Sequence, residues 1–186
     1  EMSEPNHKPI GIKSYGHIAH LSGSRMINPG DHRCNPGQEH IATVTIRDKF
    51  DRVIVQEKLD GSNVGIAREN GIIYPLIRAG YLASSSPYKQ HHLFSQWVYK
   101  NQQRFLWLLR DGERACGEWL LQAHGTRYAL WHEPLVLFDI MQGTSHRIPS
   151  DALRERAKAH GFICPEILAY GPDAVSVAKV MDALSV

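Results

Sequence analysis

The sequence has few cysteines and no long apolar run. Its three cysteines, Cys34, Cys116 and Cys164, are odd in number and far apart. This pattern gives little support to a disulfide framework and is typical of a reducing compartment, so we expect a cytoplasmic protein. No apolar stretch approaches the length that spans a bilayer, and the polar N-terminus lacks the apolar core of a secretory signal. We therefore expect no membrane partner.

The chain also lacks a large excess of charge of either sign. Its 21 basic and 19 acidic residues give a formal net charge of +2. Bulk charge therefore does not indicate a nucleic-acid-binding protein, and any basic groove has to come from local arrangement. With 186 residues, 42% of them hydrophobic, the chain can bury one good core. We expect a single domain over residues 1–186.

Residues 1–50 are rich in glycine, proline, asparagine and histidine, which indicates loops. A zinc site in this segment would have to draw on His17, His20, His32, Cys34 and His40. Their spacing fits no familiar structural-zinc pattern and one cysteine is poor support, so loop histidines are the simpler interpretation. Residues 13–18 and 41–46 are candidate strands. We expect the whole segment to pack on the rest of the domain.

Residues 52–78 have the pattern of a short antiparallel meander. The candidate strands are 52–57, 64–68 and 72–74. The Asn70-Gly71 pair between the last two is a strong hairpin signal. The Asp60-Gly61 pair between the first two predicts a tight turn, in which glycine tolerates a positive φ.

The second half of the chain mixes helices and strands without strict alternation. An amphipathic helix is expected from about residue 89 to residue 110, with its aromatic stripe in the core. Further strands are expected at 113–121, 134–140 and 163–170, and further helices at 152–160 and after residue 173. Hairpin-linked strands with interspersed helices favour an α+β fold over a doubly wound parallel sheet.

The chemistry of the sequence centres on Lys58, which follows Gln56 and Glu57 at the end of a predicted strand. A lysine held there, beside the Asp60-Gly61 turn, has lost part of its side-chain freedom. A dry or cationic pocket favours the neutral amine, which is a nucleophile. Most lysines near a turn are solvated surface residues, so Lys58 alone does not establish a catalytic site.

Further motifs follow Lys58 in order. They are Lys58-Leu59-Asp60-Gly61-Ser62-Asn63, then Arg78, Gly117-Glu118-Trp119, His124-Gly125-Thr126-Arg127-Tyr128 and Leu137-Phe138-Asp139-Ile140. Arg78 lies 20 residues after Lys58, and Phe138 lies 20 residues after Glu118. The series resembles the covalent nucleotidyltransferases, the superfamily of RNA ligases, DNA ligases and mRNA capping enzymes.

Asn63 separates these groups. In DNA ligases and capping enzymes the residue two after the motif glycine is usually arginine, whereas asparagine resembles the ATP-dependent RNA ligases. The resemblance implies a nucleotidyltransferase (ATP-grasp-like) fold of antiparallel sheets flanked by helices. A DNA ligase or capping-type enzyme is one alternative. A non-catalytic nucleotide- or RNA-binding relative is another.

The resemblance also implies a role for each motif. Lys58 would attack the α-phosphorus of ATP and carry AMP, which passes to an RNA 5′-phosphate before a 3′-hydroxyl seals the break, as in RNA repair. Mg²⁺ would offset the phosphate charge, and its protein ligands are unknown. Glu118 would bind the ribose and Phe138 would stack on adenine. The implied nucleotide-binding residues are Gln56, Glu57, Lys58, Gly61, Asn63, Arg78, Glu118 and Phe138.

Two motifs of that family are missing from the printed sequence. No E-G-x-V string and no K-x-K string follows Ile140. In the family these strings supply a metal-associated glutamate and lysines that neutralise the phosphates. We interpret the chain as a C-terminally incomplete nucleotidyltransferase domain, the N-terminal part of an enzyme, with weak or no activity by itself. A degenerate relative is the alternative interpretation.

Overall fold

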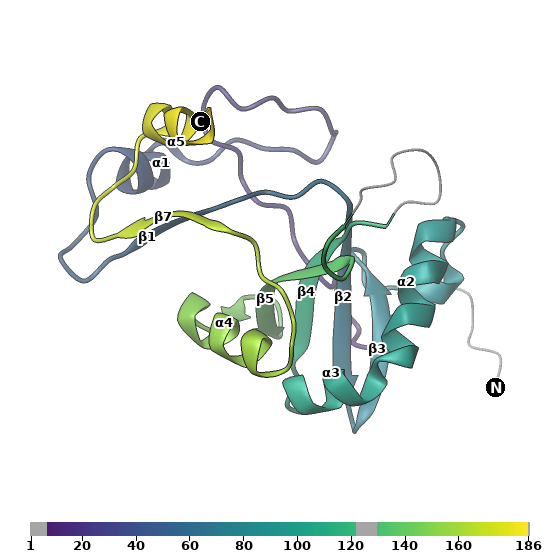
Figure 1. The fold of residues 1–186 in the computed structure, drawn as a ribbon. Helices are drawn as coiled ribbons and strands as arrows, with labels where there is room; N and C mark the ends of the chain where they lie inside the picture. The colour runs from purple at the N-terminus through teal and green to yellow at the C-terminus, as the bar shows by residue number, and fades with distance from the viewer. Residues whose placement is uncertain (1–6, 122–129, 186) are drawn as a thin grey trace. The chain divides into compact units, whose positions relative to one another are not determined.

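The computed structural model describes residues 7–121 and 130–185. The chain divides into two compact units, which are taken separately below (Figure 1). Unit 1 comprises the chain up to Gly16 together with Leu59–Pro165, and unit 2 comprises His17–Lys58 together with Glu166–Val186. The expectation that residues 1–186 form a single domain stays a prediction.

Unit 1 is built on a five-stranded antiparallel sheet with the spatial order β3-β2-β4-β5-β6. The strands are β2 (Ser62–Glu69), β3 (Ile72–Ile77), β4 (Arg114–Trp119), β5 (Leu135–Gln142) and β6 (His146–Arg147). Asn70 and Gly71, with φ values of 51° and 76°, make the turn that joins β2 to β3. The predicted Asn70-Gly71 hairpin is therefore confirmed.

The helices of unit 1 pack on one face of this sheet (Figure 1). They are the 3₁₀ helix η1 (Ala83–Ser85) and the α-helices α2 (Lys89–Lys100), α3 (Gln102–Leu108) and α4 (Ser150–Ala159). The predicted long helix is interrupted at Asn101, whose side-chain amide donates to the carbonyl oxygen of Trp97 at 2.9 Å. This local hydrogen bond competes with helix continuation, so two helices form in place of one.

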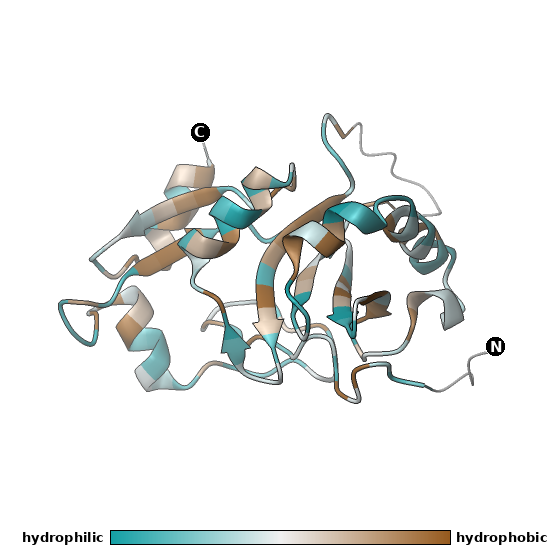
Figure 2. Ribbon diagram, turned by 90° about the horizontal axis from the view of Figure 1, so that it is seen from below, coloured by the Kyte–Doolittle hydropathy of each residue, from teal (hydrophilic) through white to brown (hydrophobic). Residues whose placement is uncertain are grey.

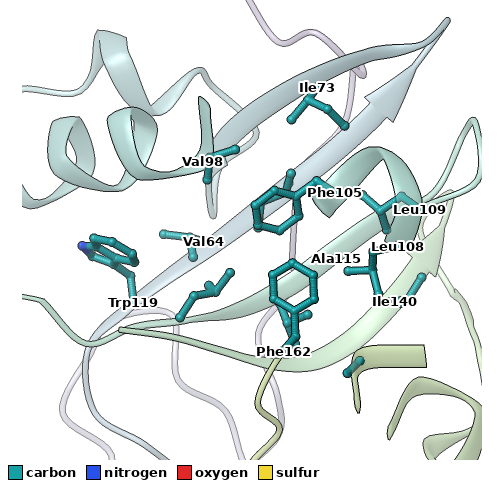
Figure 3. Close-up of a cluster of buried hydrophobic side chains, with 14 of the residues drawn as sticks. Val64, Ile73, Val98, Phe105, Leu108, Leu109, Ala115, Trp119, Ile140 and Phe162 are labelled. Atoms are coloured by element: carbon teal, nitrogen blue, oxygen red, sulfur yellow. The ribbon is translucent and has the colours of Figure 1, made fainter. Parts of the chain in front are cut away.

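The main core lies between these helices and the sheet (Figure 3). Among its members are Val64, Ile66, Phe94, Val98, Phe105, Trp119, Leu135, Leu137 and Ile140. Figure 2 shows the hydrophobic residues running along the strands, while hydrophilic residues are frequent on the helices. Because strand side chains alternate between faces, the residues next to these core positions point to the opposite face of the sheet.

Residues 12–16, which we call the strap, lie across part of that opposite face. A Cβ atom on Gly65 of β2 would lie 1.9 Å from the Ser14 Oγ, and one on Gly80 would lie 2.1 Å from the Ile12 carbonyl oxygen. Glycine at both positions makes room for the strap. The predicted strand over residues 13–18 is wrong, because the N–H groups of Ser14 and Tyr15 both donate to one carbonyl, that of Arg78, at 3.0 and 3.3 Å.

Unit 2 contains a two-stranded antiparallel sheet, in which β1 (Val53–Gln56) pairs with β7 (Ile167–Gly171). The strand expected near residues 52–57 is therefore confirmed. The predicted meander is wrong at this point, because the partner of β1 comes from much later in the chain and not from β2. Local sequence patterns specify strands better than they specify strand partners.

Unit 2 also contains the helices α1 (Pro36–Thr43) and α5 (Val177–Leu184). The predicted strand over residues 41–46 is wrong, because its first residues belong to α1. The Asn35 side chain accepts the Gly37 N–H at 2.8 Å, and Pro36 occupies the first turn; both are helix-start signals. In the described ranges, no helix of either unit combines the length and apolar character that a membrane span needs.

A buried ion pair joins the residue before β4 to α4. The Glu113 side chain is 4% exposed, and its Oε2 lies 2.7 Å from the Arg156 Nη2. The same oxygen accepts the Arg110 N–H at 2.9 Å. Burial acts to raise the pKa of Glu113, but the hydrogen bonds from Arg156 and Arg110 outweigh it and lower the pKa below its ordinary value.

We expect Glu113→Gln to lower the free energy of unfolding at neutral pH by about 3 kcal/mol, because Arg156 loses its charged partner. The pKa of Glu113 is lower in the folded than in the unfolded chain. The ionised carboxylate therefore stabilises the protein at neutral pH, and this contribution fades as the pH falls toward the folded-state pKa. Urea unfolding at several pH values checks this, with the exposed Glu155→Gln on α4 as control. Equal pH dependence in wild type and Glu113→Gln would contradict it.

Candidate functional site

Asn63 and Glu118 lie side by side at one end of the central strand pair. Asn63 of β2 is the direct antiparallel partner of Glu118 of β4. Their chain neighbours Val64 and Trp119 lie in the main core, so Asn63 and Glu118 lie on the strap face of the sheet. Both are partly exposed. The sheet thus brings two of the predicted site residues together.

The Gly61 N–H donates to the Glu118 Oε1 at 3.0 Å. Gly61 does not adopt the positive φ that glycine tolerates in a tight turn. Glycine is needed here for a different reason, because a Cβ atom would lie 2.4 Å from the carbonyl oxygen of Trp119. This close approach puts the amide within reach of Glu118, so the lysine motif and the glutamate motif are joined directly.

A β-bulge in β5 turns Phe138 to the same face. Leu137 and Asp139 pair with consecutive residues of β4, which leaves Phe138 as an extra residue between them. Leu137 lies in the main core, whereas Phe138 packs against Tyr15 of the strap. The Tyr15 hydroxyl donates to the Asp139 carboxylate. Because of the bulge, two successive residues, Phe138 and Asp139, lie on the face that carries Glu118.

Arg78 comes directly after β3, at the end of the sheet where Asn63 lies. Val64 pairs with Ile77, the last residue of β3, so Asn63 and Arg78 follow at the same end of the two strands. The Arg78 Nη2 donates to the Gly16 carbonyl oxygen at 3.3 Å. Within the described part of the chain, the buried Arg78 Nε and Asn63 Oδ1 have no hydrogen-bond partner. An unpartnered donor and an unpartnered acceptor at one strand end fit a ligand that supplies both kinds of group.

The residues that lead to Lys58 belong to unit 2. Gln56 ends β1, and the Glu57 N–H donates to the Glu166 carbonyl oxygen at 2.9 Å, which prolongs the contact with the chain before β7. The side chains of Gln56, Glu57 and Lys58 are exposed. Their predicted part in nucleotide binding stays a prediction.

Lys58 is the last residue of the first segment of unit 2, and Leu59 starts the second segment of unit 1. Chain connectivity alone therefore keeps the Cα atoms of Lys58 and Gly61 within about 11 Å of each other. The expectation that the Lys58 amine lies close to Arg78, Glu118 and Phe138 stays a prediction.

Two groups next to Phe138 are held in their protonated forms. Burial, and then the hydrogen bond to Asp139, raise the pKa of Tyr15, so its hydroxyl remains a donor at physiological pH. Burial raises the pKa of the Cys116 thiol to about 12. A neutral buried thiol is a poor nucleophile, so Cys116 is a packing residue below the site.

Two further expectations concern metals and the histidine-tyrosine motif. Among the described residues, no group of three or more His, Cys, Asp or Glu side chains is placed to hold a metal ion. His20 contacts Ser24 and Asp31, at 2.8 and 3.6 Å, within a loop. The motif at residues 124–128 lies outside the described residues. The ligands of the expected Mg²⁺ are therefore not assigned.

Three residues near Phe138, Tyr15, Asp139 and Arg147, have no role that the sequence motifs indicate; Tyr15 packs on Phe138, Asp139 follows it in β5, and Arg147 contacts both Tyr15 and Asp139. The Arg147 guanidinium lies 5.4 Å from the centre of the Tyr15 ring, and its Nε lies 3.8 Å from the Asp139 carboxylate. The one available signal was the position of Asp139 directly after Phe138. No local sequence pattern relates residue 15 to residues 139 and 147, because these residues meet only after the strap has packed on the folded sheet.

We expect Gly61→Ala to break the hydrogen bond that joins the lysine motif, through the Gly61 N–H, to Glu118. The added Cβ would press on backbone, so the loop has to shift and the Gly61 N–H loses its charged acceptor. Loss of such a hydrogen bond lowers the free energy of unfolding by about 1.5–3 kcal/mol. Gly171→Ala is the control, because its Cβ would meet nothing within 4 Å. Denaturant unfolding measures both, and equal stability of the two variants would exclude the close-approach explanation.

The residues from 51 to 184 match the family model described as RNA ligase. Comparison with curated proteins gave no match. The chain is similar to two solved structures of an archaeal ATP-dependent RNA ligase. For form 2 the sequence identity is 22% and the TM-score 0.45, and the match covers 73% of this chain and 34% of that chain. For form 1 the sequence identity is 21% and the TM-score 0.47, and the match covers 77% of this chain and 36% of that chain.

A third solved structure, provisionally named an ATP-dependent DNA ligase, comes from Aquifex aeolicus (18% identity, TM-score 0.45, 70% of this chain and 35% of that chain). The chain thus spans about a third of the length of the solved structures that it matches. The family-model match covers more than half of the sequence. The chain belongs to the RNA ligase family.

Proposed function

We propose that this chain carries the nucleotide-binding residues of an ATP-dependent RNA ligase with a nucleotidyltransferase fold, and that Lys58 is the residue that becomes adenylylated. Membership of the RNA ligase family supports a ligase function. The observation that carries the proposal is the hydrogen bond from the Gly61 N–H to the Glu118 Oε1. It joins the lysine motif to the glutamate that the family resemblance assigns to the ribose.

The residues around this hydrogen bond suit the parts of a nucleotide. Phe138 supplies an aromatic ring, which every nucleobase can stack on. The Glu118 carboxylate has about four acceptor sites, so it can accept ribose hydroxyls as well as the Gly61 N–H. The unpartnered Arg78 Nε is a donor suited to a ribose or phosphate oxygen, and the Asn63 Oδ1 is an acceptor suited to a hydroxyl.

The proposed reaction begins with the neutral amine of Lys58. Its nitrogen attacks the α-phosphorus of ATP, the bond from that phosphorus to the oxygen bridging to the β-phosphate breaks, and pyrophosphate leaves. The amine gives its proton to solvent. AMP then passes to the 5′-phosphate of an RNA strand, and a 3′-hydroxyl displaces AMP to seal the break.

The surroundings of Lys58 complete the proposal. Mg²⁺ bound with ATP would offset the negative charge of the phosphates during the first step. Gln56 and Glu57, exposed beside Lys58, would border the nucleotide. Asn63 favours RNA with a 5′-phosphate and a 3′-hydroxyl as partner, because an arginine is usual there in DNA ligases and capping enzymes. A cytoplasmic location and a role in RNA repair are parts of the same proposal.

The test is covalent labelling of the protein that carries this chain, with ATP labelled at the α-phosphate in the presence of Mg²⁺. We expect a labelled band that survives denaturing electrophoresis. Lys58→Ala and Lys58→Arg should abolish it, because alanine has no nitrogen and a guanidinium stays charged. Lys158→Ala, on the exposed surface of α4, should leave it unchanged. Equal labelling of Lys58→Ala would reject the proposal, and labelling by GTP but not ATP would indicate a capping-type enzyme.

We expect Phe138→Leu to weaken ATP binding by about 1–3 kcal/mol, the usual contribution of stacking on one base. Phe138→Tyr keeps the aromatic face and serves as the matched variant, with a much smaller expected loss. Isothermal titration of ATP into each protein measures the difference. ATP affinity that does not change in Phe138→Leu would show that the ring does not bind the base.

A further inference from the structure

The strap, residues 12–16, contacts the two predicted site residues Arg78 and Phe138. It precedes residue 51, where the match to the RNA ligase family begins. We propose that Tyr15 of the strap is a positioning residue for the nucleotide base. Its ring holds the Phe138 ring in the orientation that binds the base, and its main chain helps to hold Arg78 in place. This inference rests on the proposed function of the site.

The strap and Arg78 hold each other through main-chain groups. The Arg78 carbonyl oxygen accepts the N–H groups of Ser14 and Tyr15, at 3.0 and 3.3 Å. In return the Arg78 Nη2 donates to the Gly16 carbonyl oxygen at 3.3 Å. The guanidinium is therefore fixed on one side while its Nε stays unpartnered within the described part of the chain. A displaced Tyr15 would move the acceptor that orients Arg78.

The contact with Phe138 is made by the Tyr15 ring. The two ring centres lie 5.1 Å apart with an interplanar angle of 71°, the edge-to-face arrangement that aromatic pairs favour. Tyr15 is 3% exposed, whereas Phe138 is partly exposed. Tyr15 is thus the buried support, and Phe138 keeps the accessible surface that a base would need.

Tyr15 is itself fixed at its far end by the bulge that carries Phe138. Its hydroxyl donates to the Asp139 carboxylate, and that carboxylate lies 3.8 Å from the Arg147 Nε. The Arg147 guanidinium also lies 5.4 Å from the centre of the Tyr15 ring. The Tyr15 side chain therefore makes an edge-to-face ring contact with one residue of the bulge and a hydrogen bond through its hydroxyl with the next.

The strap main chain offers Tyr15 a fixed support. The buried Arg114 donates from its Nε to the Ser14 carbonyl oxygen at 2.7 Å, and the Cys116 Sγ donates to the same oxygen at 3.6 Å. Below it, Gly65 leaves room for the Ser14 side chain. Because the strap is seated on β2 and β4, its tyrosine can restrict Phe138 instead of moving with it.

The test compares Tyr15→Phe, which keeps the ring and loses the bond to Asp139, with Tyr15→Leu, which loses the ring. We expect ATP affinity to fall about 2- to 10-fold in Tyr15→Leu and less in Tyr15→Phe. At saturating ATP, the rate of lysine adenylylation should change less than the affinity does. Tyr99→Leu on α2, where the tyrosine is 48% exposed, is the control and should bind ATP as wild type does.

A double-mutant cycle shows whether Tyr15 acts through Phe138. In the Phe138→Leu background, Tyr15→Leu should reduce ATP affinity little further, because the ring that it positions is already gone. Fully additive losses would overturn the positioning role. So would an unchanged ATP affinity in a folded Tyr15→Leu protein, since a tyrosine that only supports the fold affects unfolding and not binding.

A readout without nucleotide separates this inference from the proposed function. The ring resonances of Phe138, in protein labelled with ¹³C at phenylalanine, should shift in Tyr15→Leu and stay in place in Tyr99→Leu. Phe138→Leu identifies the signals by their loss. Unshifted resonances overturn the positioning of Phe138, whatever binds to the site. A wild-type protein that binds no ATP overturns the proposed function and the base-positioning role together, even where the resonances do shift.

Discussion

The antiparallel pairing of β2 with β4 is the constraint on which the candidate site depends. It aligns Asn63 with Glu118, and it brings the carbonyl oxygen of Trp119 so close to Gly61 that no side chain fits there. The same approach lets the Gly61 N–H reach the Glu118 carboxylate. A shift of this pairing by one residue would send Asn63 into the core face and break the link between the two motifs.

The sheet of unit 1 separates packing from binding by its two faces. Regular alternation serves β2 and β4, whose core residues and site residues follow one another in turn. In β5 alternation alone cannot put both Phe138 and Asp139 on the site face. The bulge resolves this, because its extra residue turns Phe138 outward while Leu137 and Ile140 stay in the core. The bulge therefore places two successive residues on the face that carries Glu118.

Local signals in the sequence predicted local structure well and strand partners poorly. The Asn70-Gly71 turn and the strand at 113–121 rest on turn chemistry and strand patterns, and both are present. The partner of β1 could not be predicted, because nothing in residues 53–56 specifies a strand more than a hundred residues later. At residues 41–46, β-branched residues favoured a strand, but the capping Asn35 and the following proline start a helix that includes Ile41.

The site was predicted from motifs, and the structure brings Gly61, Asn63, Glu118 and Phe138 to one face of one sheet. The physical reason for Gly61 was not predictable from the sequence. A close approach to another strand has no local signature, whereas a turn glycine does. The same limit hides Tyr15, whose contacts with Phe138 and Asp139 exist only once β5 and the strap lie on the same sheet.

In the part of unit 1 that the structure describes, buried polar atoms without hydrogen-bond partners lie on both faces of the sheet, and two of those on the strap face belong to the proposed nucleotide site. On the helix side, charged groups are paired. Arg104 donates two hydrogen bonds to Glu133, at 2.7 and 2.8 Å, and Arg156 donates to Glu113 at 2.7 Å. On the strap side, Ser14 Oγ, Asn63 Oδ1 and Arg78 Nε are buried without hydrogen-bond partners among the described residues. On the core side, Trp119 Nε1 and Arg68 Nε share this state.

Each unpartnered buried group costs about 1–3 kcal/mol, so a fold selected for stability alone would pair them. Two of these atoms, Asn63 Oδ1 and Arg78 Nε, lie at one strand end, and Ser14 Oγ lies over Gly65 in the middle of β2. Apolar substitution at Asn63 or Arg78 would remove this cost, yet the sequence keeps polar groups at both positions. A bound molecule that donates to Asn63 and accepts from Arg78, as the proposed nucleotide would, removes the cost as well.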